Sequence, residues 1–270
     1  MGERLSPRGV FDTHAHYTDE RFAAEFEGGA DAAIRECFAD GMAGIVNVGT
    51  NIENSRRAVM QAKNYPLMYA AVGIHPSDIG MSGGFDEEMS ALSALLSGRE
   101  EDGIVALGEI GLDYHWQPYD KELQAKYLDA QLSLAREMDI PVIIHDREAH
   151  GDSLRIVCDY PQLRGVFHCY SGSVEMAREL LALGWYLGFD GPVTYKNARK
   201  TVEVAEMVPL DRILIETDSP YMSPVPLRGK RNDSRNVFYM AEKLAQIRGM
   251  TTQEMADITL ENGKRLFGIQ

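Results

Sequence analysis

The chain is poor in cysteine, in long apolar runs and in positive charge. It has three cysteines in 270 residues, and none of them stands in a CxxC pair. The odd number argues against a disulfide framework and fits a reducing compartment. No apolar run approaches the roughly 18 residues that a transmembrane helix needs, and residues 1–8 lack the apolar stretch of a signal peptide. We therefore expect a cytoplasmic protein with no membrane partner.

Basic residues are clearly outnumbered by acidic ones. There are 27 Lys and Arg against 41 Asp and Glu, which gives a formal net charge of −14. This balance argues against a protein that coats nucleic acid non-specifically, because such binding depends on many positive charges. A protein of this charge that acts on a polyanion must gather its few basic residues, or metal ions, at one face.

Eight short runs of apolar or β-branched residues predict β-strands, and segments with an apolar period near 3.6 predict helices between several of them. Length and rhythm are those of an α/β protein of the (β/α)8 TIM barrel type, in a single domain over residues 1–270. A doubly wound sheet is the alternative, but it would place its site between two strands at one switch point. The predicted strands are 10–16, 44–50, 68–76, 104–113, 141–147, 165–172, 185–193 and 212–220, and the predicted helices are 22–38, 52–64, 121–138, 174–183, 198–207, 237–248 and 252–267.

Residues able to bind metal stand at the ends of five of these strands. The carboxyl ends of parallel strands meet at one mouth of a barrel, so these side chains are expected to form one site. In the first strand, His14 and His16 point to the same side because side chains alternate with period two. The six candidate metal ligands are His14, His16, Glu109, His145, His168 and Asp218.

Four imidazoles and two carboxylates suffice for two divalent metal ions. Glu109 is interpreted as a carboxylate that bridges the two ions, and Asp218 as a ligand and general base for an activated water. The set does not choose between Mg²⁺, Mn²⁺ and Zn²⁺. A single buried histidine is more often a hydrogen-bonded core residue than a ligand, but the repetition at successive strand ends favours the metal interpretation.

Other residues at the same mouth are candidates for contacts to substrate. His75 ends the third strand and is interpreted as a catalytic group that contacts phosphate or transfers a proton; a structural role is equally compatible. Tyr114 and Tyr170 are expected to stack on nucleobases, or else to pack loops together. Alternation along the strand predicts that Cys169 points away from the face that carries His168. Glu216 is expected to lie deeper in the barrel and to support a ligand.

Basic residues follow the last two predicted strands, and four of them are candidates for contacts to phosphate. Barrels of this type often bind phosphate with the loops after strands seven and eight. The basic stretch after strand eight stands out in an acidic chain, so phosphate contacts are predicted there, with an ordinary solvated surface as the alternative. These residues are Lys196, Arg228, Lys230 and Arg231.

Several of these stretches together resemble the TatD family of metal-dependent hydrolases, within the wider amidohydrolase-like superfamily. The resemblance covers nearly the whole chain, and no ligand of the family's set is missing. It implies that the six candidates above are metal ligands, and it implies metal-dependent DNase activity, including removal of nucleotides from 3′ ends. The matching stretches are 11–16, 73–76, 108–114, 144–147, 167–172, 216–221 and the basic loop 228–232.

We therefore predict a hydrolase with two divalent metal ions that cleaves phosphodiester bonds of DNA, in the manner of a 3′–5′ exonuclease on single strands, as a monomer or weak oligomer. One alternative is a hydrolase of an amide, ester or aminoacyl bond on the same scaffold, because many reactions share this barrel. An aminoacylated RNA would also satisfy the basic loop. A binding protein without turnover is the second alternative, which the complete ligand set disfavours.

Overall fold

The computed structural model describes residues 9–270; residues 1–8, in which no signal-peptide pattern was found, lie outside the described part. Within it, eight parallel strands form one sheet in the order of the sequence, from β1 to β8. An isolated bridge between Ala15 of the first strand and Ser219, four residues after the last strand, brings the sheet close to a closed barrel. The strands are β1 Phe11–Ala15, β2 Gly44–Val48, β3 Met68–Val72, β4 Ile104–Asp113, β5 Val142–Arg147, β6 Gly165–Phe167, β7 Tyr186–Phe189 and β8 Ile213–Ile215.

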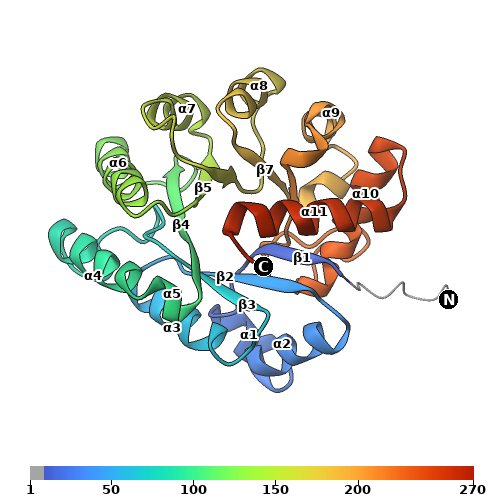
Figure 1. Cartoon of the computed structure of the whole chain (residues 1–270), viewed down its shortest axis with the longest axis horizontal. Coiled ribbons are helices and arrows are strands. Elements are labelled where there is room, and N and C mark those ends of the chain that lie inside the picture. Colours follow the sequence, from blue (N-terminus) through green and yellow to red (C-terminus); the bar gives the residue numbers. More distant parts are fainter. Residues whose placement is uncertain (1–8) are drawn as a thin grey trace.

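Helices surround this sheet and connect its strands (Figure 1). Their starts carry the expected capping side chains: Asp120 accepts a hydrogen bond from Leu123 N–H at the start of α6, and Thr251 with Glu254 forms a capping box at the start of α11. The helices are α1 Glu20–Glu25, α2 Gly29–Ala39, α3 Ile52–Ala62, α4 Phe85–Ser97, α5 Arg99–Asp102, α6 Lys121–Glu137, α7 His150–Cys158, α8 Val174–Ala182, α9 Arg199–Met207, α10 Val237–Arg248 and α11 Thr252–Phe267.

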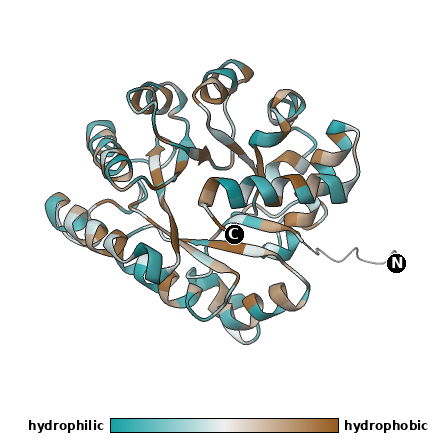
Figure 2. Ribbon diagram, viewed as in Figure 1, coloured by the Kyte–Doolittle hydropathy of each residue, from teal (hydrophilic) through white to brown (hydrophobic). Residues whose placement is uncertain are grey.

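The apolar core has two layers, one between the sheet and the helices and one inside the barrel. Hydrophobic residues follow the strands and the inward faces of the helices in Figure 2. Helix α11 lies across the amino ends of the strands (Figure 1), where Leu266 and Phe267 pack on the inner layer and the Asn262 amide donates to the carbonyl of Ile213. Because α11 covers the amino ends of the strands, the carboxyl ends are left for a site.

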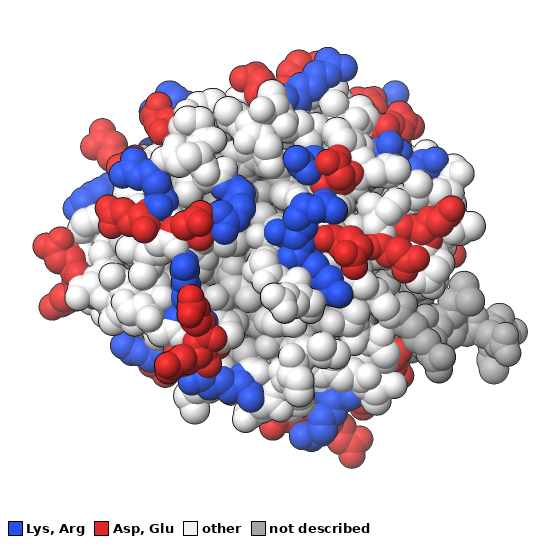
Figure 3. Space-filling model, in the orientation of Figure 1, with Lys and Arg blue, Asp and Glu red and all other residues white. Residues whose placement is uncertain are grey.

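The face on which α11 lies carries basic and acidic side chains that are intermixed (Figure 3). Such a surface has no large area of one sign, so it offers a polyanion little net attraction. Within the described residues, none of the helices combines the length and the apolar character that crossing a membrane requires.

The predicted (β/α)8 barrel is confirmed, with differences in detail. The segment predicted as one helix over 22–38 is two helices, because Gly28 and Gly29 take positive φ values of 83° and 69° and break it. Helices α4, α5 and α7 were not predicted. Strands β6 and β8 are shorter than expected, so several candidate site residues stand in the loops just after the strands.

Candidate metal centre

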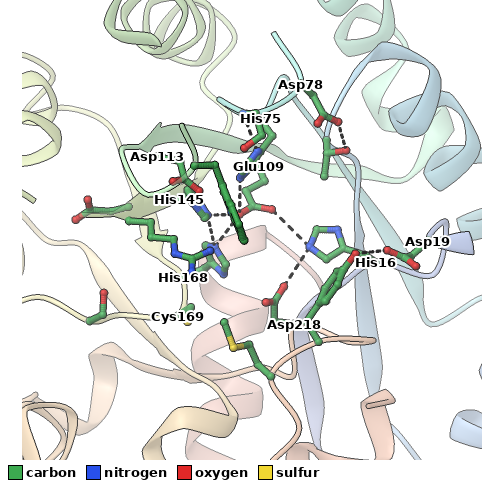
Figure 4. Close-up of a pocket in the computed structure, with 18 of the residues that line it drawn as sticks. His16, Asp19, His75, Asp78, Glu109, Asp113, His145, His168, Cys169 and Asp218 are labelled. Carbon is green, nitrogen blue, oxygen red and sulfur yellow. Dashed lines mark hydrogen bonds and ion pairs between the residues drawn. The ribbon is translucent and has the colours of Figure 1, made fainter. Parts of the chain in front are cut away.

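The six candidate ligands lie together at the carboxyl ends of the strands, and five of them are labelled in Figure 4. His14 is in β1 and His16 directly follows it. Glu109 and His145 are in β4 and β5, while His168 follows β6. Asp218, the sixth, stands three residues after β8. Neighbouring strands of a barrel thus supply side chains that are far apart in the sequence, as strand-end motifs predict.

The two carboxylate oxygens of Glu109 face different pairs of histidines. Oε2 lies 3.3 Å from His14 Nε2 and 3.5 Å from His16 Nε2. Oε1 lies 2.7 Å from His145 Nδ1 and 2.8 Å from His168 Nε2. Burial raises the pKa of Glu109, but the charges of the surrounding histidines outweigh burial and hold it well below its ordinary value. One ionised carboxylate therefore joins two clusters of nitrogen ligands.

The spacing of the ligand atoms fits two divalent ions. Two atoms that each lie about 2.1 Å from the same ion are roughly 3 to 3.5 Å apart. In the first cluster, the Nε2 atoms of His14 and His16 are 3.0 Å apart, and Asp218 Oδ1 lies 3.2 Å from His16 Nε2. In the second, His145 Nδ1 lies 3.2 Å from His168 Nε2. These distances are those expected between ligands that share an ion, whereas the contacts of Glu109 Oε1 at 2.7 and 2.8 Å are shorter, as hydrogen bonds are.

The hydrogen bonds behind two of the rings leave the correct nitrogen free for a metal. His16 Nδ1 lies 2.9 Å from the carbonyl oxygen of Val48, so Nδ1 carries the proton and Nε2 presents its lone pair to the cluster. His145 Nε2 lies 3.2 Å from Asp113 Oδ2, so Nε2 donates to this carboxylate and Nδ1 faces Glu109. A carboxylate or carbonyl behind a histidine is the usual support of a metal-ligating imidazole.

The same two histidines hold protons when metal is absent. Burial lowers the pKa of His16, but the hydrogen bond and charge of Asp218 outweigh it and raise the pKa to about 9. Burial also lowers the pKa of His145, and its bonds to Asp113 and Glu109 raise it to about 9. Divalent ions would displace these protons, because a metal ligand must be deprotonated.

His75, which follows β3, differs from these rings. Its Nδ1 accepts a hydrogen bond from the Ser77 N–H at 3.1 Å. Burial, aided by the charge of His145, lowers the pKa of His75 to about 3, so the ring is neutral. A neutral imidazole that accepts at Nδ1 carries its proton on Nε2, and this N–H lies 3.7 Å from Glu109 Oε1. His75 therefore presents a donor to the site, although it stands within one group of metal-binding side chains with Glu109 and His145.

Glu216 lies deeper in the barrel than the candidate ligands, as expected, but makes no hydrogen bond to His168. It is fully buried, with His168 Nδ1 at 3.7 Å from its Oε1, and its other oxygen accepts a hydrogen bond from the hydroxyl of Thr13. Gly188 of β7 makes room for it: a Cβ there would lie 2.5 Å from Glu216 Oε2. The glycine is needed for this close approach rather than for a turn.

The expectation for Cys169 is wrong. Cys169 lines the same cavity as His168, because β6 ends at Phe167 and alternation no longer applies to the residues after it. Cys169 has a φ of 44°, and its N–H donates to Glu216. Asp218, with a φ of 53°, is a second non-glycine residue in this unfavourable region. Such backbone conformations are often found at functional sites, where surrounding contacts hold them.

Five of the candidate ligands line a cavity of about 760 Å³, and His14 is buried behind them. Tyr170 lines it too, but is 4% exposed and donates its hydroxyl to the carbonyl of Ser173. Tyr114 is buried outside the cavity lining and stacks on Tyr119. Two aromatic residues at the cavity are exposed, Trp116 with 62% and Tyr221 with 43% of their surface accessible.

The predicted phosphate-binding residues do not line this cavity in the described structure. Lys196 and Lys230 are exposed. The guanidinium of Arg228 lies 4.4 Å from the ring centre of Tyr195. Arg231 packs on Phe26, with its Cζ 4.3 Å from the centre of the ring. Any contact that they make to a substrate must therefore involve a part of it that extends beyond the cavity.

Two residues at the site received no role from the sequence. Asp113, behind His145, stands four residues after Glu109 on β4, and Arg147, which lines the cavity, stands two residues after His145 on β5. Both spacings are even, so strand alternation places each on the side of its strand that carries the ligand. That periodicity is the signal that could have found them.

Comparisons with known proteins agree with this site. The model of the family described as TatD related DNase matches residues 11–268. The chain belongs to the TatD family. It is a metal-dependent hydrolase of that family, and it is 43% identical over 263 residues to the uncharacterized metal-dependent hydrolase YabD of Bacillus subtilis, covering 96% of this chain and 99% of the relative.

Two further relatives are informative. The 3′-5′ ssDNA/RNA exonuclease TatD of Escherichia fergusonii is 32% identical over 269 residues, covering 96% of this chain and 99% of that protein. The crystal structure of YjjV, a TatD homologue from Escherichia coli K12, superposes with a TM-score of 0.88 at 31% identity, covering 98% of this chain and all of the other. The family, the metal-dependent chemistry and the barrel are thereby shown.

Proposed function

We propose that this protein hydrolyses phosphodiester bonds of single-stranded DNA and removes nucleotides from the 3′ end. The observation that carries the proposal is the position of Glu109, whose two oxygens join two clusters of histidines. Paired metal sites that share a ligand are found in nucleases and phosphatases, among other hydrolases. The name of the exonuclease relative from Escherichia fergusonii supports the substrate class.

In this proposal the six candidate residues hold two divalent ions, with His14, His16 and Asp218 on one side of Glu109 and the remaining two histidines on the other. When bound, such ions polarise the phosphodiester, lower the pKa of water and stabilise the leaving oxygen. Mg²⁺, Mn²⁺ and Zn²⁺ are the candidate ions by ligand chemistry, and the test below restores each separately.

Asp218 is the proposed general base. Burial raises its pKa, but the hydrogen bond and charge of His16 outweigh burial and keep it below the ordinary value. The carboxylate is therefore ionised at neutral pH and can accept a proton from the attacking water. His16 Nε2 lies 3.2 Å from Asp218 Oδ1, so the two atoms are close enough to face the same ion.

His75 is proposed to donate a hydrogen bond to an oxygen of the substrate. Its proton is held on Nε2, because Nδ1 accepts from Ser77, and the low pKa keeps the ring neutral. A neutral donor stabilises charge that develops on a phosphoryl oxygen without competing as a cation for Glu109.

The test is a substrate panel with metal-stripped protein restored with one metal at a time. We expect one of these metals to restore the release of a labelled mononucleotide from a 3′-labelled single strand, and a 5′-labelled strand to give a ladder of products. Asp218→Asn, purified alongside, controls for contaminating nucleases. Aminoacyl-tRNA and small esters complete the panel; if only these are hydrolysed, the nuclease proposal fails in favour of an ester or aminoacyl hydrolase.

A further inference from the structure

Among the described residues that line the cavity, Arg147 is the one arginine or lysine. It is the last residue of β5, two positions after His145, and its side chain is half-buried. Within the described chain, its guanidinium has no ion pair and no hydrogen bond; what it has is a cation–π contact, with Cζ 5.3 Å from the ring centre of Trp116. A partly desolvated guanidinium without an acidic partner is unusual, because removing this group from water is costly.

Acidic side chains are near Arg147, but they are committed to other groups. Asp146, the preceding residue, lies 2.7 Å from His150 Nδ1 and accepts a hydrogen bond from the Ser153 hydroxyl at 3.1 Å. Asp113 is bonded to His145. Because these carboxylates already have partners, the charge of Arg147 remains available for an anion that enters the cavity.

Trp116, which stands in the loop after β4, provides the complementary feature. Its side chain is 62% exposed although it lines the cavity. The ring of His115 meets it edge to face, with ring centres 4.8 Å apart and planes at 85°. An indole held between two neighbours and left open at a cavity presents an aromatic surface on which a planar ring can stack.

We propose that Arg147 and Trp116 form a nucleotide-binding subsite, in which the guanidinium binds a phosphate and the indole stacks on the base. The subsite adjoins the cluster of His145 and His168 rather than that of His16, because Arg147 and His145 share β5. This subsite deepens the proposed function. It rests on that function in one respect, because the nucleotide that it binds is taken to be the one next to the cleaved bond.

The experiment measures binding of two small probes to the metal-loaded protein by isothermal titration. The probes are dAMP and 2-deoxyribose 5-phosphate, which differ by the base alone. Arg147→Gln should weaken both probes equally, by about 10- to 100-fold, the usual effect of losing a hydrogen bond to a charged group. Trp116→Leu should leave the sugar phosphate unchanged and weaken dAMP by roughly 5- to 100-fold, as loss of base stacking does. Trp116→Phe should recover part of this loss.

Arg178→Gln is the matched control, since Arg178 is an exposed arginine of α8 that does not line the cavity. It makes the same charge change and should bind both probes like the wild type. Unchanged binding in Arg147→Gln, or an unchanged preference for dAMP in Trp116→Leu, overturns the subsite. Loss of phosphate binding in Arg178→Gln as well would also overturn it, by showing a general charge effect.

Because the readout is binding, the subsite and the proposed function can fail separately. If the variants bind the two probes as expected but the wild type cleaves neither DNA nor RNA, the exonuclease proposal is wrong and the subsite stands. If the wild type cleaves single strands but Arg147→Gln binds dAMP like the wild type, the subsite is wrong and the exonuclease proposal stands.

Discussion

Asp12 accepts two hydrogen bonds from Thr217, from the main-chain N–H at 2.9 Å and from the hydroxyl at 2.6 Å. Asp12 is in β1 and Thr217 follows β8, so this pair joins the first strand to the last where the sheet itself contributes an isolated bridge. His14 stands two residues after Asp12, and Asp218 directly follows Thr217. The bonds that close the barrel therefore also set the positions of two candidate ligands.

Asp12→Ala should destabilise the protein by about 1 to 3 kcal/mol, because the buried N–H of Thr217 loses its partner. Asp12→Asn, which keeps an acceptor oxygen, should cost less. The measurement is urea unfolding of both variants with metal removed, so that metal binding does not contribute. Equal midpoints for Asp12→Ala and the wild type would contradict the closing role of this pair.

Asp218→Asn should lower turnover by about 10²-fold or more, because it removes the proposed base and one charged ligand while keeping the shape of the side chain. The metal-free variant should still unfold cooperatively, with a lower thermal midpoint at neutral pH, because His16 loses the charge that raises its pKa. Steady-state rates are measured at saturating metal, so that weaker metal binding does not account for the loss. Near-normal turnover under these conditions would remove Asp218 from the mechanism.

Much of the fold could be predicted, because the barrel repeats one pattern of buried strand and amphipathic helix. Strand β4 matches its prediction at both ends, and helix α11 does so as well, since its capping box is visible in the sequence. Helix α7 begins with His150, Gly151 and Asp152 and has nine residues. These weak helix formers obscure its start, whereas α8 and α9, which also have nine residues, could be predicted from their apolar period.

The candidate ligands were accessible to sequence reasoning because each ends an apolar run. The surroundings of the ligands were not. Whether Tyr114 is exposed depends on Tyr119 and Lys121, which cover its ring in the structure. The direction of Cys169 depends on where β6 stops pairing with its neighbours. The fold of the loop after β4 decides the first and the pairing between strands decides the second, and neither follows from an apolar period.

The basic loop after β8 gives a prediction about long substrates. Arg228 and Lys230 do not line the cavity in the described structure, so contacts to phosphate there require a strand that extends beyond it. Arg228→Ala with Lys230→Ala should weaken binding of a 15-nucleotide strand and reduce its salt slope by about 0.7 per lost contact. Binding of a dinucleotide should not change. Arg231 is left intact because it packs on Phe26; an unchanged salt slope would identify the loop as an ordinary solvated surface.

The raised pKa of His145 gives a prediction about stability against pH in the metal-free protein. The folded pKa is about 9, above the ordinary value of 6.5, so the protonated ring stabilises the fold fully below pH 6.5. This contribution is lost as the pH rises through 9. The free energy of unfolding of the wild type, minus that of His145→Asn, should therefore fall between pH 6.5 and 9. A difference that stays constant across this range would show that the two carboxylates do not raise the pKa of His145.

Glu109→Gln tests whether one carboxylate serves both clusters. The amide keeps the volume of the side chain but removes the charge that both groups of histidines share, so both ions should bind more weakly, by more than about 10-fold each. His145→Asn, which alters one cluster, should weaken one ion and spare the other. Metal content after dialysis against a fixed free-metal concentration measures this directly.

Glu148→Gln is the control for this prediction. The Glu148 carboxylate lies outside both clusters, is 62% exposed and pairs with His115, so two ions should remain. If Glu109→Gln still holds one ion at wild-type affinity, Glu109 belongs to a single cluster and the two sites are independent.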